Sequence, residues 1–85
     1  MNGIQKSFSP IDYTFEWDGD WYRWDREEAI RQAKAARTAE ARRLRAAGYQ
    51  VRAFSMPDQL VRRGGIGSGH PDVEFYVTAY YLNAF

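Results

Sequence analysis

Residues 25–48, DREEAIRQAKAARTAEARRLRAAG, are the stretch that decides the fold. Asp25 can cap the free amides that begin a helix, and Glu28, three residues later, completes a capping box. The residues up to Ala47 are almost all good helix formers, and Gly48 is the residue type that ends helices in a left-handed conformation. The stretch therefore predicts one helix of about 22 residues, which is about 33 Å long at 1.5 Å per residue.

The core-facing stripe of this helix is expected to be mostly small. At the three- and four-residue spacing of one helix face, it comprises Ile30, Ala33, Ala41, Leu44 and Ala47. Small side chains allow close approach to a sheet that carries bulky aromatic residues. Arg37 falls near the middle of the stripe, so we expect it either to pair with Glu40 at the helix edge or to face a partner, because a buried unpaired charge is costly.

Alternation of apolar and polar residues predicts a β-hairpin before the helix. Residues 11–17 alternate and are followed by Asp18-Gly19, a dipeptide typical of a type I′ turn. This turn would place Trp17 opposite Asp20, with Tyr13, Phe15, Trp17, Tyr22 and Trp24 on one side of the hairpin. A three-residue turn that includes Asp20 would shift the pairing.

Two further strands are predicted after the helix. Residues 49–55 alternate, and residues 72–82 carry the strongest strand pattern in the chain. Between them, residues 56–63 are expected to hold one irregular helical turn led by Pro57, and residues 64–71 a flexible glycine-rich connection.

The order strand, strand, helix, strand, strand predicts an α+β fold, β-β-α-β-β. We expect a two-layer sandwich in which one long helix covers a four-stranded, mainly antiparallel sheet. A right-handed crossover favours the spatial order 1-2-4-3, with 2-1-4-3 as the alternative. Residues 1–10 are expected to form a weakly ordered N-terminal lead-in, and residues 11–85 a single domain.

Composition excludes several classes of protein. The chain of 85 residues has no cysteine and one histidine, which excludes a thiol nucleophile, disulfides, iron–sulfur clusters and a Cys/His zinc site. No apolar run approaches the roughly 20 residues that cross a bilayer, and the first residues lack the apolar stretch of a secretory signal. The sequence therefore predicts a cytoplasmic protein with no membrane partner.

Charge is distributed unevenly along the chain. Residues 1–30 contain seven acidic and three basic residues, whereas residues 31–63 contain nine basic and two acidic ones. Such a local density of cations can bind phosphates or an acidic protein surface, although a solvated helix face explains it equally well. The candidate anion or nucleic-acid contacts are Arg31, Lys34, Arg42, Arg45, Arg62 and Arg63.

One helix covers only one face of a sheet, so the other face is expected to be open. By alternation, that face would carry several aromatic and arginine residues, the types enriched at binding hot spots. The ordinary explanation is cross-strand packing of aromatic residues on a wet face. The candidate partner-binding residues are Trp21, Arg23, Arg52, Phe54, Tyr76 and Tyr80.

The remaining motifs do not indicate catalysis. The segment GGIGSG (residues 64–69) is followed by Pro71 and a strand rather than by a helix N-terminus, so it is not a phosphate-binding loop. His70 has no recognisable catalytic neighbours, and the acidic residues around the first hairpin lack the spacing of a calcium loop. We expect no catalytic residue, metal, cofactor or small-molecule substrate.

Two functions from different classes follow. The first is a small non-enzymatic protein-interaction module, which regulates or inhibits a larger complex or forms a homodimer through its open sheet face. The second is a single-stranded nucleic-acid-binding domain that uses the same face together with the basic helix and the Arg/Gly loop. The second lacks the RNP1 pattern of an RNA-recognition motif.

Overall fold

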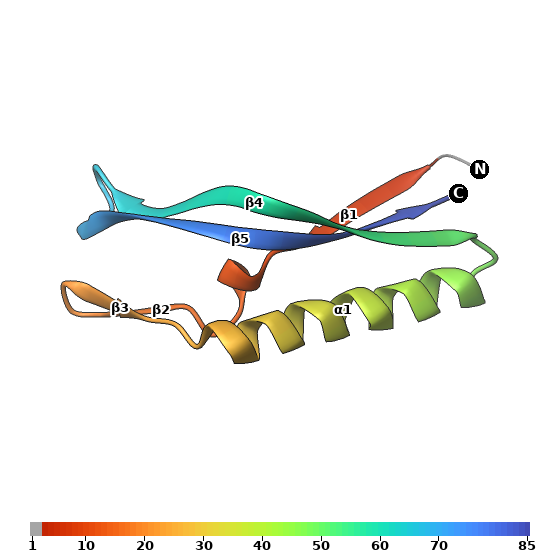
Figure 1. Ribbon diagram of the computed structural model, residues 1–85, viewed down its shortest axis with the longest axis horizontal. Coiled ribbons are helices and arrows are strands. Elements are labelled where there is room, and N and C mark those ends of the chain that lie inside the picture. The colour runs from red at the N-terminus through yellow and green to blue at the C-terminus, as the bar shows by residue number, and fades with distance from the viewer. Residues whose placement is uncertain (1–2) are drawn as a thin grey trace.

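The computed structural model describes residues 3–85. Its elements, in chain order, are β1 (Ile4–Phe8), a short 3₁₀ helix (Pro10–Asp12), β2 (Glu16–Asp18), β3 (Trp21–Arg23), α1 (Arg26–Ala46), β4 (Val51–Gly65) and β5 (His70–Ala84). An antiparallel sheet has the order β1-β5-β4, and β2 and β3 form a separate hairpin. The helix and this hairpin lie on the same side of the long β4–β5 ribbon (Figure 1). The molecule is elongated, 46 × 23 × 20 Å.

The predicted α+β class is confirmed, but the predicted single four-stranded sheet is wrong. The last strand is central and pairs antiparallel with the strand that follows the helix, as expected. Neither of the two predicted orders is correct, because the first hairpin does not join the sheet. Its aromatic rings pack onto the side chain of Phe75 instead, and β1 takes the free place beside β5.

Strand β1 lies within the segment expected to be a weakly ordered lead-in. Its residues pair with the end of β5, from Ile4 opposite Ala84 to Phe8 opposite Tyr80. Ile4 and Phe8 pack against the core between the sheet and the helix, at the period of two that a half-buried strand requires. Residues 1 and 2 of the expected lead-in lie outside the described residues.

The first hairpin is shorter than predicted and shifted in register. Residues Pro10–Asp12 form a 3₁₀ turn rather than a strand. Trp17 pairs with Tyr22, so the two-residue turn is Gly19-Asp20 and not Asp18-Gly19. Both registers pair odd-numbered residues of the first strand with even-numbered residues of the second. The predicted aromatic side is therefore preserved, with Phe15, Trp17, Tyr22 and Trp24 half-buried.

Residues 56–63 continue β4 and do not form the expected helical turn. The irregularity in this segment is a β-bulge, because Met56 pairs with Ala79 while Gln59 pairs with Val77. Two residues of β4, Pro57 and Asp58, thus lie opposite one residue of β5, and Asp58 has a φ of 56°. The expected flexible connection is also shorter, since β4 and β5 extend to Gly65 and His70, which pair.

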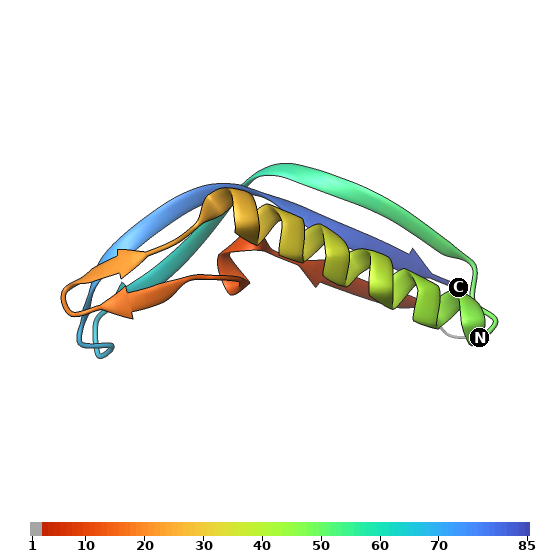
Figure 2. The same cartoon turned by 90° about the horizontal axis from the view of Figure 1, so that it is seen from below.

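Strand β5 buries opposite faces in its two halves. Leu82 and Ala84, both even-numbered, pack in one core cluster with Ala41 and Leu44 of the helix. Near the other end of β5, the buried residues of the second cluster are odd-numbered, and they pack with the hairpin aromatics. Because successive side chains of a strand alternate, the ribbon must twist between these halves. Figure 2 shows β4 and β5 crossing near the middle of the molecule.

The helix confirms the prediction of a small buried stripe, with one change. Ala33, Ala41 and Leu44 are buried, whereas Ala47 is exposed beyond the end of the helix. The side chain of Asp25 accepts the backbone N–H of Glu28, which confirms the predicted N-cap. The predicted capping box is wrong, because the backbone N–H of Asp25 donates to Thr14 Oγ1 and the Glu28 carboxylate accepts from Arg31 and Gln32 instead.

Substitution of Gly64 by alanine tests the close approach of β4 to β5 at the tip of the ribbon. A Cβ at Gly64 would lie 1.9 Å from the Pro71 carbonyl oxygen, whereas one at Gly67 would meet no atom within 4 Å. Both glycines have a φ near +84°, so both alanine variants lose about 1–2 kcal/mol from the left-handed backbone. Urea unfolding of Gly64→Ala should show a further loss of about 1–3 kcal/mol from the clash. Equal losses in the two variants would contradict this packing.

Candidate functional site

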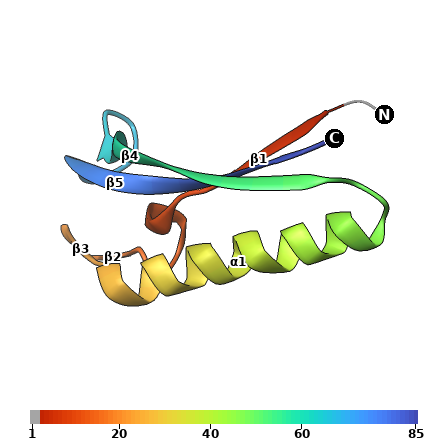
Figure 3. The ribbon, with the colours of Figure 1, turned by 45° about the vertical axis from the view of Figure 1, so that its right-hand side comes forward.

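The sheet face opposite α1 is the candidate site. Among residues 3–85, no other element covers this face where the helix lies below the sheet (Figures 1 and 3). Alternation along the three strands and the observed register place eight side chains there. These residues, which we call the open face, are Gln5, Ser7, Arg52, Phe54, Met56, Tyr81, Asn83 and Phe85.

Aromatic side chains form the apolar part of the open face. Phe54 and Tyr81 are cross-strand partners, and their rings stack with centroids 5.2 Å apart and an interplanar angle of 12°. Phe85 is 51% exposed. Its backbone exchanges two hydrogen bonds with Gln50, of 2.8 and 2.9 Å, which continue the β4–β5 ladder to the end of the chain. The rings are therefore held by paired backbone rather than by a loop.

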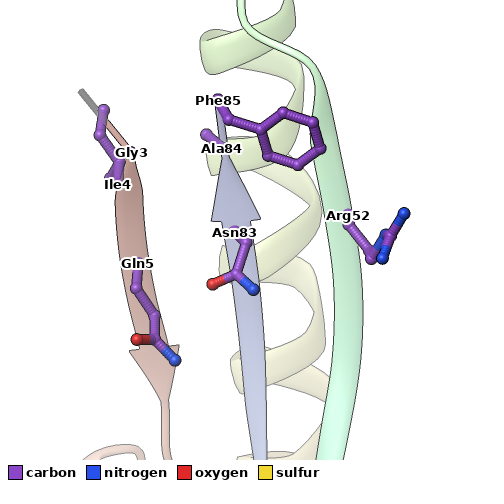
Figure 4. Close-up of a pocket in the computed structure, with 7 residues that line it drawn as sticks. All are labelled: Gly3, Ile4, Gln5, Arg52, Asn83, Ala84 and Phe85. Carbon is purple, nitrogen blue, oxygen red and sulfur yellow. The ribbon is translucent and has the colours of Figure 1, made fainter. Parts of the chain in front are cut away.

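A shallow hollow of about 330 Å³ lies at the end of the open face (Figure 4). The carboxamides of Gln5 and Asn83 and the guanidinium of Arg52 come from three neighbouring strands, since Asn83 pairs with both other residues. The ring of Phe85 borders the same hollow. These groups offer hydrogen-bond donors and acceptors beside an apolar surface, which suits peptide groups and carboxylates.

The six residues predicted to bind a partner are not brought together. Arg52 and Phe54 lie on the open face, as expected. Tyr80 is only 6% exposed; it lies on the helix side, where Lys34 Nζ and Arg37 Cζ are 5.5 and 5.2 Å from its ring centroid. The prediction that Tyr80 belongs to the exposed face is wrong, because β5 reverses its buried face before this residue.

The other three predicted contact residues are exposed elsewhere. Trp21 and Arg23 lie on the outer side of the β2–β3 hairpin, where Trp21 is 61% exposed and Arg23 binds Asp18 with an Nη2–Oδ2 distance of 2.7 Å. Tyr76 is 62% exposed on the hairpin-covered half of the ribbon. The separate hairpin keeps Trp21 and Arg23 off the open face. Tyr76 alternates with Phe75 and Val77, which face the hairpin, so it lies on the uncovered side of the far half of the ribbon, beyond the open face.

Three of the six predicted anion contacts are neutralised by carboxylates. Arg31 pairs with Glu28 on the helix, Arg62 Nε lies 3.0 Å from Glu74 Oε1, and Arg63 Nη2 lies 2.7 Å from Asp12 Oδ1. The hydrogen bond from Arg31 lowers the pKa of Glu28, and the same bond raises the pKa of Arg31. The remaining three, Lys34, Arg42 and Arg45, form no salt bridge with any residue from 3 to 85.

Arg37 adopts neither of the two expected arrangements. Its Nη1 donates to the carbonyl of Phe54 at 2.8 Å, at the outer strand of the sheet. Glu40 instead binds Arg43 and Lys6, with Lys6 Nζ 3.3 Å from Glu40 Oε2. The hydrogen bond from Arg43, followed by that from Lys6, lowers the pKa of Glu40. On the side of the helix near β1, two cations therefore share one carboxylate, whereas Lys34 and Arg37, on the side near β4, form no salt bridge within residues 3–85.

Sequence reasoning missed six of the eight residues of the open face, which are Gln5, Ser7, Met56, Tyr81, Asn83 and Phe85. Alternation along β5 is uninterrupted and places Tyr81 on the same strand face as Phe75 and Val77. The twist of the ribbon leaves that face uncovered at Tyr81 and turns it toward the hairpin at Phe75 and Val77. Pro57-Asp58 is a signal for the bulge in β4, but no local pattern in β5 reveals the twist. Gln5 was missed because β1 was expected to be unpaired.

A double-mutant cycle tests whether the Phe54–Tyr81 stack is a real contact on the open face. Phe54→Ala and Tyr81→Ala should show a coupling of about 0.5–1.5 kcal/mol in urea unfolding, because stacked rings contribute beyond their buried area. Phe54→Ala with Trp21→Ala is the matched control, and its coupling should be close to zero because the two rings do not touch. Equal coupling in both cycles would show that the rings are not paired.

Comparison with known proteins adds no assignment. Within residues 3–85, no cluster of three or more His, Asp or Glu side chains could hold a metal ion. No helix in the same range is long and apolar enough to cross a membrane. The chain matches no protein-family model, no curated protein and no solved structure.

Proposed function

We propose that the protein is a small protein-interaction module without enzymatic activity, which binds another protein through the open face. The observation that carries this proposal is the fixed row of Phe54, Tyr81 and Phe85 beside Arg52 on an uncovered sheet. Aromatic and arginine side chains are enriched at binding hot spots. A rigid sheet loses little conformational entropy when it binds, which favours affinity.

The polar members of the open face support a protein partner rather than a small molecule. Gln5, Asn83 and Arg52 line a shallow hollow at the end of the aromatic row, which resembles the polar rim around an apolar interface core. A stable interface needs about 800 Å² from each partner. The broad side of the molecule, 46 by 23 Å, is large enough to supply it.

A module of this kind acts by occupying a surface of its partner. With a mass of 9.9 kDa and one principal face, it would serve as a stoichiometric regulator or inhibitor of a larger complex. A second copy of the chain is the partner that can be tested without any other component.

Sedimentation velocity between about 1 μM and about 1 mM, the range of weak protein association, tests the self-association form of the proposal. We expect a reversible dimer that Arg52→Glu and Phe85→Ser each weaken at least about tenfold, a typical hot-spot loss. Arg42→Glu, a charge reversal on the helix, should leave the dimer unchanged. A strict monomer at about 1 mM would exclude self-association and leave a different protein as the partner.

Binding of single-stranded nucleic acid is the alternative function. It is favoured by Lys34, Arg42 and Arg45, which lack salt bridges within residues 3–85, and by the stacked rings of Phe54 and Tyr81. However, the helix and the open face lie on opposite sides of the sheet. A strand whose bases stack on the rings would have its phosphates away from most of these cations.

Fluorescence anisotropy with a labelled single-stranded oligonucleotide of mixed sequence separates the two functions. For a protein-binding module we expect no binding at about 150 mM salt, and at most weak binding at about 20 mM, where surface charges are less screened. Binding at moderate salt that is lost in the Arg42→Glu, Arg45→Glu double variant would favour the nucleic-acid function instead.

A further inference from the structure

The outer edge of β4 has free main-chain hydrogen-bonding groups. β4 lies at the end of the sheet and pairs only with β5 among residues 3–85. Gln50 and Phe85 exchange both of their backbone hydrogen bonds, and the register is unbroken from there to Met56. In an antiparallel ladder, alternate residues then direct N–H and C=O outward. These residues are Val51, Ala53 and Ser55, and we call residues 51–56 the free edge.

Within the free edge no proline or bulge interrupts the ladder, and Arg52 is its one charged residue. Natural edge strands are often very short or covered, since exposed edges recruit other strands. Pro57 and the bulge interrupt β4 only after Met56, which leaves a segment of six residues, about 20 Å long at 3.3 Å per residue. This length suits the addition of one short strand.

Cations of the helix lie beside the free edge. Arg37 Nη1 donates to the Phe54 carbonyl at 2.8 Å and to Ser55 Oγ at 3.4 Å, so this side of α1 adjoins β4. Lys34 Nζ lies 5.5 Å from the ring of Tyr80, the cross-strand partner of Ser55. Arg45 follows Lys34 on the same side of the helix, because eleven residues make about three turns. Arg37, Lys34 and Arg45 form no salt bridge within residues 3–85.

The opposite edge of the sheet carries less unpaired positive charge. Beside β1, Lys6 and Arg43 share one carboxylate, that of Glu40. A second copy of the chain added to the free edge would bring its own Lys34 and Arg45 toward the same cations. Like charges at close range are repulsive, so the charge pattern favours a partner strand of opposite sign.

We propose that the free edge binds an extended acidic segment of a partner protein by strand addition. Main-chain groups of the segment would pair with Val51, Ala53 and Ser55. Its side chains alternate between two environments. Acidic residues would face the helix cations, and apolar residues would lie beside Arg52 and Phe54 at the margin of the open face. The ligand is therefore a strand with an acidic residue at every second position.

Labelled octapeptides with alternating glutamate and valine test this proposal by fluorescence anisotropy at low salt. We expect binding that is at least about tenfold weaker for a lysine–valine peptide, because opposite charge steers and holds the strand. A peptide of the same composition with its glutamates in one block should also bind at least about tenfold more weakly. Equal binding of all three peptides, or no binding of the alternating one at about 1 mM, would overturn the proposal.

Peptide methylation separates strand addition from simple charge attraction. Methylation of alternate peptide nitrogens removes main-chain donors without changing the charge, so it should abolish binding of the glutamate–valine peptide. The double variant Lys34→Glu, Arg45→Glu should reduce binding at least about tenfold. Arg23→Glu, on the distant hairpin, is the matched control and should have no effect. Unchanged binding of the methylated peptide would overturn strand addition.

The results of these peptide-binding experiments do not depend on the function proposed for the open face. Loss of peptide binding in the Lys34→Glu, Arg45→Glu variant with an unchanged sedimentation profile would show two separate surfaces. Displacement of the peptide by a single-stranded oligonucleotide at equal or lower concentration would instead favour nucleic acid as the occupant of this edge and overturn the peptide assignment.

Discussion

The β-bulge at Pro57 and Asp58 is the constraint on which the arrangement of the molecule depends. One extra residue in β4 allows odd-numbered residues of that strand, Val51 and Val61, to pack into both core clusters. β5 changes at the same place from odd-numbered to even-numbered core residues. The twisted ribbon therefore offers one face to the helix and the other to the aromatic hairpin, and both layers lie on the same side of the molecule.

Both candidate surfaces are consequences of this division. A single helix covers one face of the sheet and leaves the other open. The hairpin packs against the far half of the ribbon instead of extending the sheet. Beside the helix the edges of the sheet are therefore β1 and β4, and in the far half they are β4 and β5. On the β1 side, Glu40 pairs with Lys6 and Arg43, whereas on the β4 side Lys34, Arg37 and Arg45 form no salt bridge within residues 3–85. The two edges of the sheet thus differ in charge as well as in the strands that form them.

Two of the eight residues of the open face, Arg52 and Phe54, were predicted as site residues from the sequence. They were placed correctly because the strand after the helix alternates without interruption as far as the bulge. Tyr80 and Tyr81 were assigned to the wrong sides because the ribbon twists, so that the covered face of β5 differs between its two halves. The cationic character of residues 31–63 was also overestimated, since Glu74 and Asp12 come from distant segments and neutralise Arg62 and Arg63.

The sequence by itself determined the local elements: the capped helix with its small buried stripe, the aromatic side of the hairpin and the two strands after the helix. These follow from capping, propensity and periodicity, which act over a few neighbouring residues. Only the tertiary structure decided that residues 4–8 pair with residues 80–84 and that the hairpin stays out of the sheet. Strand pairing joins residues far apart in the chain. Whether β1 or the hairpin pairs with the edge of β5 depends on how both pack in the whole molecule, and a local sequence pattern carries no information on that packing.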